Sequence, residues 1–215
     1  LAIVGLPVYA GRLPNLLLNY LTTWQSNGAW AVPVVVYGNR SYGNALVELY
    51  DILRYRGFHP IAAAAFVGQH SFTTRLATGR PDREDLEKAE QFSAEIVRRI
   101  LQPGEFTGIK IPGQGAPDYG GYYKPKGRDE EVVNFLKAKP VTTDACIDCR
   151  RCAKVCPMGA IRLDHPSEVS GICIKCNACV KQCPVHAKQL TDEAYLSHVG
   201  FLENRYTSRA RIELF

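Results

Sequence analysis

The sequence predicts an α/β protein in two parts, a doubly wound parallel sheet followed by a small α+β domain rich in cysteine. Over the first hundred residues, short apolar runs alternate with helical patterns, which is typical of parallel βαβ units. All eight cysteines lie between Cys146 and Cys183. A turn-rich stretch with many Gly, Pro and Tyr residues separates the two regions, as expected of a domain boundary. The predicted divisions are a partial sheet domain at 1–102, a connection at 103–140, a cysteine domain at 141–191, and a helix with a tail at 192–215.

Three apolar runs are predicted to form buried strands, at residues 1–6, 32–37 and 61–67. Their β-branched residues and flanking Gly or Pro favour strands over helices. Helical patterns occupy residues 16–24 and 45–55, and Gly57 suits the position just after the second helix. Asp82 is predicted to cap a third helix that ends near Leu101.

Ligands of such sheets bind at the carboxyl ends of the strands, so the loops after the first two strands carry the candidate cofactor site. Both loops contain Gly and Tyr, which allow close backbone approach and supply a flat aromatic surface. Ordinary loop packing is the alternative for the tyrosines. We interpret His70, after the third strand, as a structural histidine, and no catalytic constellation stands out. The candidate cofactor contacts are Pro7, Tyr9, Ala10, Gly11, Gly38, Asn39, Arg40 and Tyr42.

The cysteines form an internal duplication. Cys173 lies 27 residues after Cys146, and the same interval separates the other three pairs. Each copy reads C-x-x-C-x-x-C-x-x-x-C-P, so a proline turns the chain away after the last cysteine. A cubane cluster needs thiolates on four iron corners, and a tight loop with cysteine at every third residue reaches three of them.

This segment resembles the bacterial two-cluster ferredoxins over residues 141–190. The resemblance implies that the fourth cysteine of each run ligates the other cluster. One [4Fe–4S] cluster would then use Cys146, Cys149, Cys152 and Cys183. The second would use Cys173, Cys176, Cys179 and Cys156.

Zinc and disulfides are the alternatives for these cysteines. A zinc site takes four ligands and has no use for a third closely spaced cysteine followed by Cys-Pro. Disulfides fit poorly because a reducing compartment keeps thiols free, and the sequence shows no secretory signal. Basic residues crowd the loops, where they either raise the cluster potentials, form a docking patch for an acidic partner, or are simply solvated.

The loops at residues 7–14 and 38–43 look like the two flavin-contacting loops of flavodoxins, with Tyr42 where that family stacks a tyrosine on the ring. The whole chain thus resembles flavodoxin-like proteins with a C-terminal ferredoxin domain, which implies FMN as a further cofactor. The family's Ser/Thr-rich phosphate loop is missing, and the strands match the third to fifth of the fold. We therefore expect roughly 40 to 60 further residues before Leu1 in the natural polypeptide, about two βα units.

The formal net charge of +5 is spread among acidic residues, so no one-signed stripe predicts nucleic-acid binding. No apolar run is long enough to span a bilayer, and we expect a cytoplasmic protein. The leading hypothesis is low-potential electron transfer between redox partners and a flavin. The alternatives are a flavin-dependent reductase with its substrate near Tyr9, Arg12, Arg40, Tyr42 and His70, or a subunit of a larger redox complex whose first domain is a docking scaffold.

Overall fold

The computed structural model describes residues 1–102, 108–116 and 118–215. The predicted turns at 103–107 and at position 117 lie outside these residues. The chain divides into two compact units, which we call the sheet unit and the cysteine unit. The sheet unit comprises Leu1–His70, Arg75–Tyr123 and Ser208–Phe215. The cysteine unit comprises Ser71–Thr74 and Lys124–Thr207. The connection predicted at 103–140 is thus shared between the units, and the end of the tail belongs to the sheet unit.

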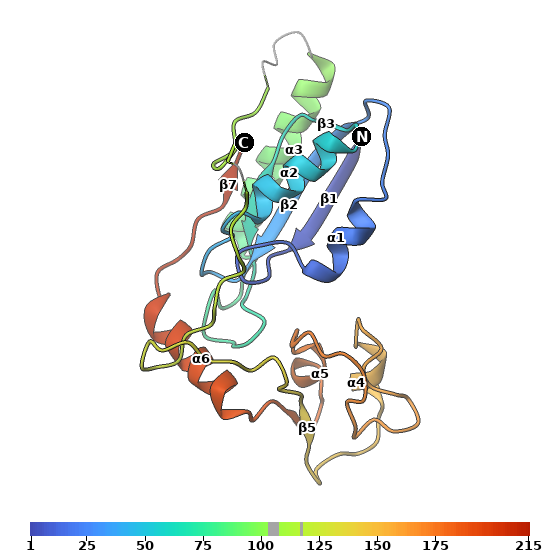
Figure 1. Ribbon diagram of the computed structural model, residues 1–215, viewed down its shortest axis with the longest axis vertical. Coiled ribbons are helices and arrows are strands. Elements are labelled where there is room, and N and C mark those ends of the chain that lie inside the picture. Colours follow the sequence, from blue (N-terminus) through green and yellow to red (C-terminus); the bar gives the residue numbers. More distant parts are fainter. Residues whose placement is uncertain (103–107, 117) are drawn as a thin grey trace. The chain divides into compact units, whose positions relative to one another are not determined.

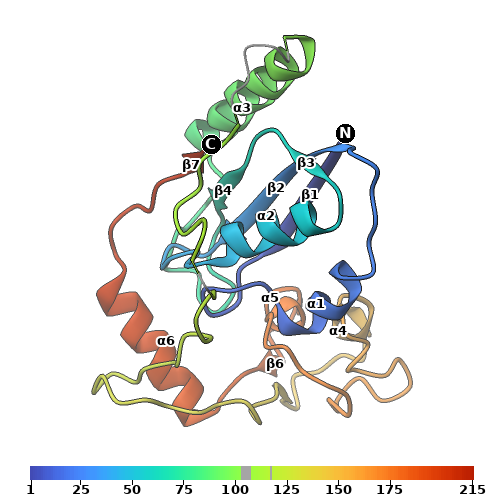
Figure 2. The same cartoon turned by 45° about the horizontal axis from the view of Figure 1, so that its top comes forward.

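The sheet unit is built on a mixed sheet whose order is β1-β2-β4-β7 (Figures 1 and 2). The strands β1 (Ala2–Pro7), β2 (Trp30–Tyr37) and β4 (Ala64–Val67) are parallel, and β3 (His59–Pro60) also pairs with β2. The α/β class predicted from the alternating runs is confirmed. The short strand β7 (Glu213–Leu214) runs antiparallel to β4 and was not predicted.

Helices cover both faces of this sheet. Along β2, Val35 packs in the core that contains α1 (Asn15–Leu21) and α2 (Ala45–Tyr55). Its neighbour on the opposite face, Val32, packs with Phe92 and Ile96 of α3 (Arg83–Leu101). Figure 1 shows α2 in front of the sheet and α3 behind it. The period-two alternation of a strand therefore divides its side chains between two cores, as in a doubly wound sheet.

The helix α3 begins where the sequence predicts. The Asp82 side chain accepts a hydrogen bond from the N–H of Asp85 at 3.1 Å, and the Asp85 side chain accepts one from the N–H of Asp82 at 3.0 Å. This reciprocal capping box satisfies two N–H groups that the first helical turn leaves without partners. Asp85 also forms a buried ion pair with Arg80 at 2.5 Å, which fixes the approach to the helix.

Strand β1 lies at the edge of the sheet and, among the described residues, pairs with β2 alone. Its side chain Ile3 is 64% exposed, whereas Val4 on the opposite face is buried. The face of β1 that carries Ile3 therefore lacks the helical cover that β2 and β4 have.

The cysteine unit combines one small antiparallel ladder with three helices. Strand β5 (Val141–Thr142) pairs with β6 (Lys188–Gln189), and α4 (Arg151–Lys154) and α5 (Ala178–Lys181) each follow a cysteine loop. The predicted C-terminal helix is present as α6 (Glu193–Arg205), which Asp192 caps through the N–H of Tyr195 at 2.8 Å. A small hydrophobic core of this unit contains Phe135, Leu190 and Tyr195.

None of the helices in the described part of the chain combines the length and the apolar run that a bilayer crossing requires.

Candidate metal centre

The duplication in the sequence is also a duplication in backbone conformation. Asp148 and Arg150 have φ of 51° and 59°, and their counterparts Lys175 and Asn177 have φ of 55° and 57°. A left-handed residue reverses the chain tightly at some steric cost to a side chain other than Gly or Asn. Each loop places two left-handed residues among its first three cysteines, and each loop therefore bends around one space.

The last cysteine of each run receives a backbone hydrogen bond from the residue four positions later. The N–H of Ala160 donates to Cys156 Sγ at 3.3 Å, and the N–H of Ala187 donates to Cys183 Sγ at 3.2 Å. Hydrogen bonds of this kind stabilise negative charge on sulfur and tune an iron–sulfur centre.

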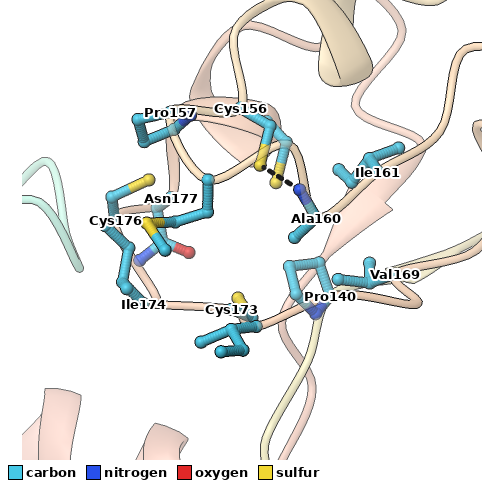
Figure 3. A pocket seen from close by; sticks show the side chains of 13 residues that line it. Pro140, Cys156, Pro157, Ala160, Ile161, Val169, Cys173, Ile174, Cys176 and Asn177 are labelled. Atoms are coloured by element: carbon cyan, nitrogen blue, oxygen red, sulfur yellow. Dashed lines mark hydrogen bonds between the residues drawn. The ribbon is translucent and has the colours of Figure 1, made fainter. Parts of the chain in front are cut away.

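Two cavities collect the cysteines into two sets of four. The first-loop cavity is lined by three cysteines of the first run and by the last cysteine of the second run. The second-loop cavity has the reverse composition. Cys146, Cys149, Cys152 and Cys183 line the first-loop cavity. Cys173, Cys176, Cys179 and Cys156 line the second-loop cavity. In Figure 3, the sulfur atoms of Cys156, Cys173 and Cys176 surround the second-loop cavity.

A single metal ion and a cubane cluster require different spacings of their thiolate ligands. Within the described residues, no three His, Cys, Asp or Glu side chains come close enough together to hold one metal ion. Thiolates on one zinc ion lie about 4 Å apart, because Zn–S bonds are about 2.3 Å long and tetrahedral. A cubane spreads its ligands over four separate iron atoms, so its thiolates lie farther apart.

Asn177 gives a second test of whether a cluster fits the second-loop cavity. Its side chain is 5% exposed and its Oδ1 has no hydrogen-bond partner, while Nδ2 donates to the Tyr195 hydroxyl at 2.8 Å. Figure 3 shows the oxygen directed into the space between the cysteines. Turning the amide by half a rotation keeps the shape and presents the NH₂ group to the cavity, at the expense of the hydrogen bond from Nδ2 to the Lys175 carbonyl at 3.4 Å. The Tyr195 hydroxyl would then donate to the amide oxygen instead of to the Phe72 carbonyl. A cluster sulfur in the cavity would accept a hydrogen bond from that NH₂ group.

Burial makes several of these thiols hard to ionise in the protein alone. It raises the pKa of Cys179 to about 11, and neighbouring Cys176 and Cys173 add to the shift. Burial also raises the pKa of Cys152, where Lys188 is the main opposing influence. At Cys183 burial acts in the same direction, but the backbone N–H groups after it outweigh burial and the pKa is lowered. Iron binds thiolate, so assembly of the site releases protons.

The predicted flavin residues of the second loop are engaged by the end of the chain. The Tyr42 hydroxyl donates to the Glu213 carboxylate at 2.6 Å. Asn39 Nδ2 donates to the Ser208 carbonyl at 2.9 Å, and its Oδ1 accepts from the N–H of Ala210 at 3.1 Å. The sequence offered no sign of these contacts, because β7 is too short to show a strand pattern.

Residues of the connection engage the two arginines of these loops. Arg12 forms a bidentate ion pair with Glu48 at 2.9 and 2.6 Å, and Tyr119 and Tyr122 lie against its guanidinium. Arg40 lies over the ring of Tyr123 at 4.0 Å from the ring centre. The connection tyrosines thus pack within the sheet unit, and the buried Glu48 was missed because one carboxylate inside an amphipathic helix carries no pattern.

The remaining candidate residues form a close contact between the two loops. Tyr9 and Arg12 exchange backbone hydrogen bonds at 2.9 and 3.0 Å, and Ala10 and Gly11 between them have positive φ. A side chain at Gly43 would come within 2.5 Å of the Gly11 carbonyl oxygen. Pro7 ends β1, and Gly38 packs directly on His70. The structure therefore brings the two predicted loops together.

Residues 145–187 match the model of the family described as a 4Fe-4S dicluster domain. A comparison with curated proteins finds no match. The match and the eight cysteines show a ferredoxin-like iron–sulfur domain, which supports [4Fe–4S] clusters and iron–sulfur electron transfer.

Proposed function

We propose that the chain relays single low-potential electrons between redox proteins through two [4Fe–4S] clusters, one in each cysteine cavity. The observation that carries this proposal is the sorting of eight cysteines into two cavities of four. When bound, a [4Fe–4S] cluster accepts and releases one electron without bond breaking in the protein. The chain supplies the thiolates and the hydrogen bonds to sulfur, and its fold sets the distance over which the electron moves.

The crossed composition of the cavities supports crossed ligation. Cys156 follows the first loop but lines the second-loop cavity, and Cys183 follows the second loop but lines the first-loop cavity. Helices α4 and α5, which carry the chain from each loop to its last cysteine, contact one another. This arrangement favours two clusters close enough for direct electron exchange.

Exposure of the cysteines favours the first loop as the place where electrons enter or leave the protein. Cys146 and Cys149 of the first-loop set are exposed, whereas in the second-loop set Cys179 is buried and Cys156, Cys173 and Cys176 are half-buried. Electron transfer weakens steeply with distance, so the partner is expected to dock over the exposed thiolates. The partner is a second redox protein, either transient or part of a larger complex.

A flavin in the sheet unit is a second candidate, and the meeting of the loops at Gly11 and Gly43 favours it. FMN bound there would have to displace the hydrogen bond from Tyr42 to Glu213 or accommodate it. A flavin would couple two-electron chemistry to the one-electron clusters. Flavin analysis of the protein purified from cells decides between this arrangement and a sheet unit that serves as a docking scaffold.

Anaerobic purification with iron, sulfide and zinc analysis tests the main proposal. We expect about eight iron atoms per chain and broad visible absorption that bleaches on reduction. Stoichiometric zinc in place of iron would overturn it.

A further inference from the structure

Lys188 and Ile161 occupy equivalent positions of the duplicated segment but differ in charge. Lys188 lies 27 residues after Ile161, the interval that separates the paired cysteines. Lys188 lines the first-loop cavity and Ile161 lines the second-loop cavity. Both are buried, with 2% and 4% of their surface exposed. One cavity therefore has a buried cation where the other has a hydrocarbon side chain.

The Lys188 ammonium is held in place by the fold. Its backbone belongs to β6, which pairs with β5 next to the cavity, and its Nζ donates to the Ser167 carbonyl at 3.1 Å. The cavity that Lys188 lines is the one formed by Cys146, Cys149, Cys152 and Cys183.

We propose that Lys188 gives the cluster in the first-loop cavity a higher reduction potential than the cluster in the second-loop cavity. This inference rests on the proposed function, because it requires a cluster in each cavity. A cluster with four thiolates is an anion, and one-electron reduction makes it more negative. A fixed buried cation beside it stabilises the reduced form. The electron passes from the reduced second-loop cluster to the oxidised first-loop cluster, with no proton or group transferred.

Other charges near the loops do not cancel this asymmetry. Asp148, beside the first loop, is exposed and paired with Arg150 at 3.3 Å. Lys175, beside the second loop, donates to the carbonyls of Leu136 and Cys173 and does not line the cavity. Exposed charges are screened strongly by water and salt and buried charges much less, and Lys175 is half-buried whereas Lys188 is buried. Arg150 and Arg151 also line the first-loop cavity and act in the same direction as Lys188.

The inferred order places the higher potential at the exposed cysteines. Cys146 and Cys149 belong to the first-loop cavity and are exposed. An electron therefore rests on the cluster that a partner can approach. This gives the relay a direction, from the second-loop cluster to the first-loop cluster and then to the acceptor.

The test is a redox titration of the anaerobic full chain, monitored by electron paramagnetic resonance, in the wild type and in Lys188→Met. In the wild type we expect two reduction steps. The step at the higher potential should belong to the resonance signal that Cys146→Ser perturbs. In Lys188→Met, the equilibrium ratio of the first electron on the two clusters should shift roughly tenfold toward the second-loop cluster. This ratio corresponds to about 59 mV for a one-electron couple.

Lys154→Met is the matched control, because Lys154 lies on α4 in the same segment but is exposed. It removes the same charge and should move the first step much less than Lys188→Met does. Equal shifts in the two variants, or first reduction of the second-loop cluster in the wild type, would overturn the inference. If Lys188→Met fails to assemble its clusters, the order in which the two wild-type clusters are reduced still tests the inference. Failure of the wild type to hold about eight iron atoms would refute the proposed function instead.

Discussion

The sulfur of Cys183 accepts a hydrogen bond from the N–H of Ala187 at 3.2 Å and lines the cavity of the first cysteine loop, not that of its own sequence neighbours. Cys183→Ala should therefore remove the cluster associated with Cys146 and leave the second-loop cluster. About half of the iron should be lost, and one resonance signal should remain. Cys156→Ala is the matched variant and should have the opposite effect. Loss of the same signal from both variants would contradict crossed ligation.

The buried amide of Asn177 predicts a sharp response to a one-atom change. Asn177→Asp places a carboxylate beside an anionic cluster and removes the NH₂ group that the turned amide would present to it. We expect the second-loop cluster to assemble poorly, because an unpaired buried charge is costly. Iron content per chain and the resonance signals measure the loss.

Asn134→Asp is the control for this change, since Asn134 is exposed and its side-chain oxygen already accepts from the N–H of Leu136 at 3.0 Å. Its iron content should equal that of the wild type. If Asn177→Asp also retained full iron, the amide would have no contact with a cluster.

Because Arg80 and Asp85 form a buried ion pair, we expect a large loss of folding stability when one of the two side chains is removed. Arg80→Met should lower the free energy of unfolding of the sheet unit by about 3 kcal/mol, the lower end for a broken buried pair, because the buried Asp85 carboxylate keeps the half-exposed Arg209 as a charged partner at 3.1 Å. Arg83→Met, which removes an exposed pair with Glu87, should cost under about 1 kcal/mol. Chemical denaturation of both variants measures the difference, and similar losses would refute this interpretation.

Asp85 also predicts acid sensitivity of the sheet unit. The hydrogen bond from Arg80 lowers the pKa of Asp85, and the hydrogen bond that the Asp82 N–H donates to the Asp85 carboxylate acts in the same direction. A lowered pKa means that the stabilisation is complete above the unfolded value of about 3.9 and is lost as the pH falls through the folded value. Denaturation at a series of acidic pH values should show this loss in the wild type and a smaller one in Asp85→Asn.

Substitution of Tyr42 distinguishes between a structural role of its hydroxyl and a contact of its ring with a flavin. Tyr42→Phe should reduce the free energy of unfolding by about 1–2 kcal/mol, because the Glu213 carboxylate loses its donor. Tyr20→Phe, at a tyrosine that is 62% exposed, should change it little. Unchanged stability in Tyr42→Phe together with loss of bound flavin would favour the ring contact instead.

Local patterns predicted much of this structure because short-range physics determines those parts. The second helix has the predicted bounds, and α3 begins at the predicted Asp82 cap. The duplicated cysteines imply a duplicated backbone, which the matching φ values of Arg150 and Asn177 show.

Contacts between distant segments were not predictable from periodicity. The pairing of β7 with β4, the Glu48 partner of Arg12, and the burial of Lys188 all depend on residues far apart in the chain. The basic residues of the cysteine loops look alike in the sequence. Only the structure separates Lys188, which is buried, from Lys154, which is exposed.

Metal and sulfide analysis of the anaerobically purified chain, combined with resonance spectra of the reduced protein, tests the central claim most directly. Two [4Fe–4S] clusters predict about eight iron and eight sulfide atoms per chain and two paramagnetic centres that interact. About four iron atoms with a single centre, or bound zinc without sulfide, would contradict the account.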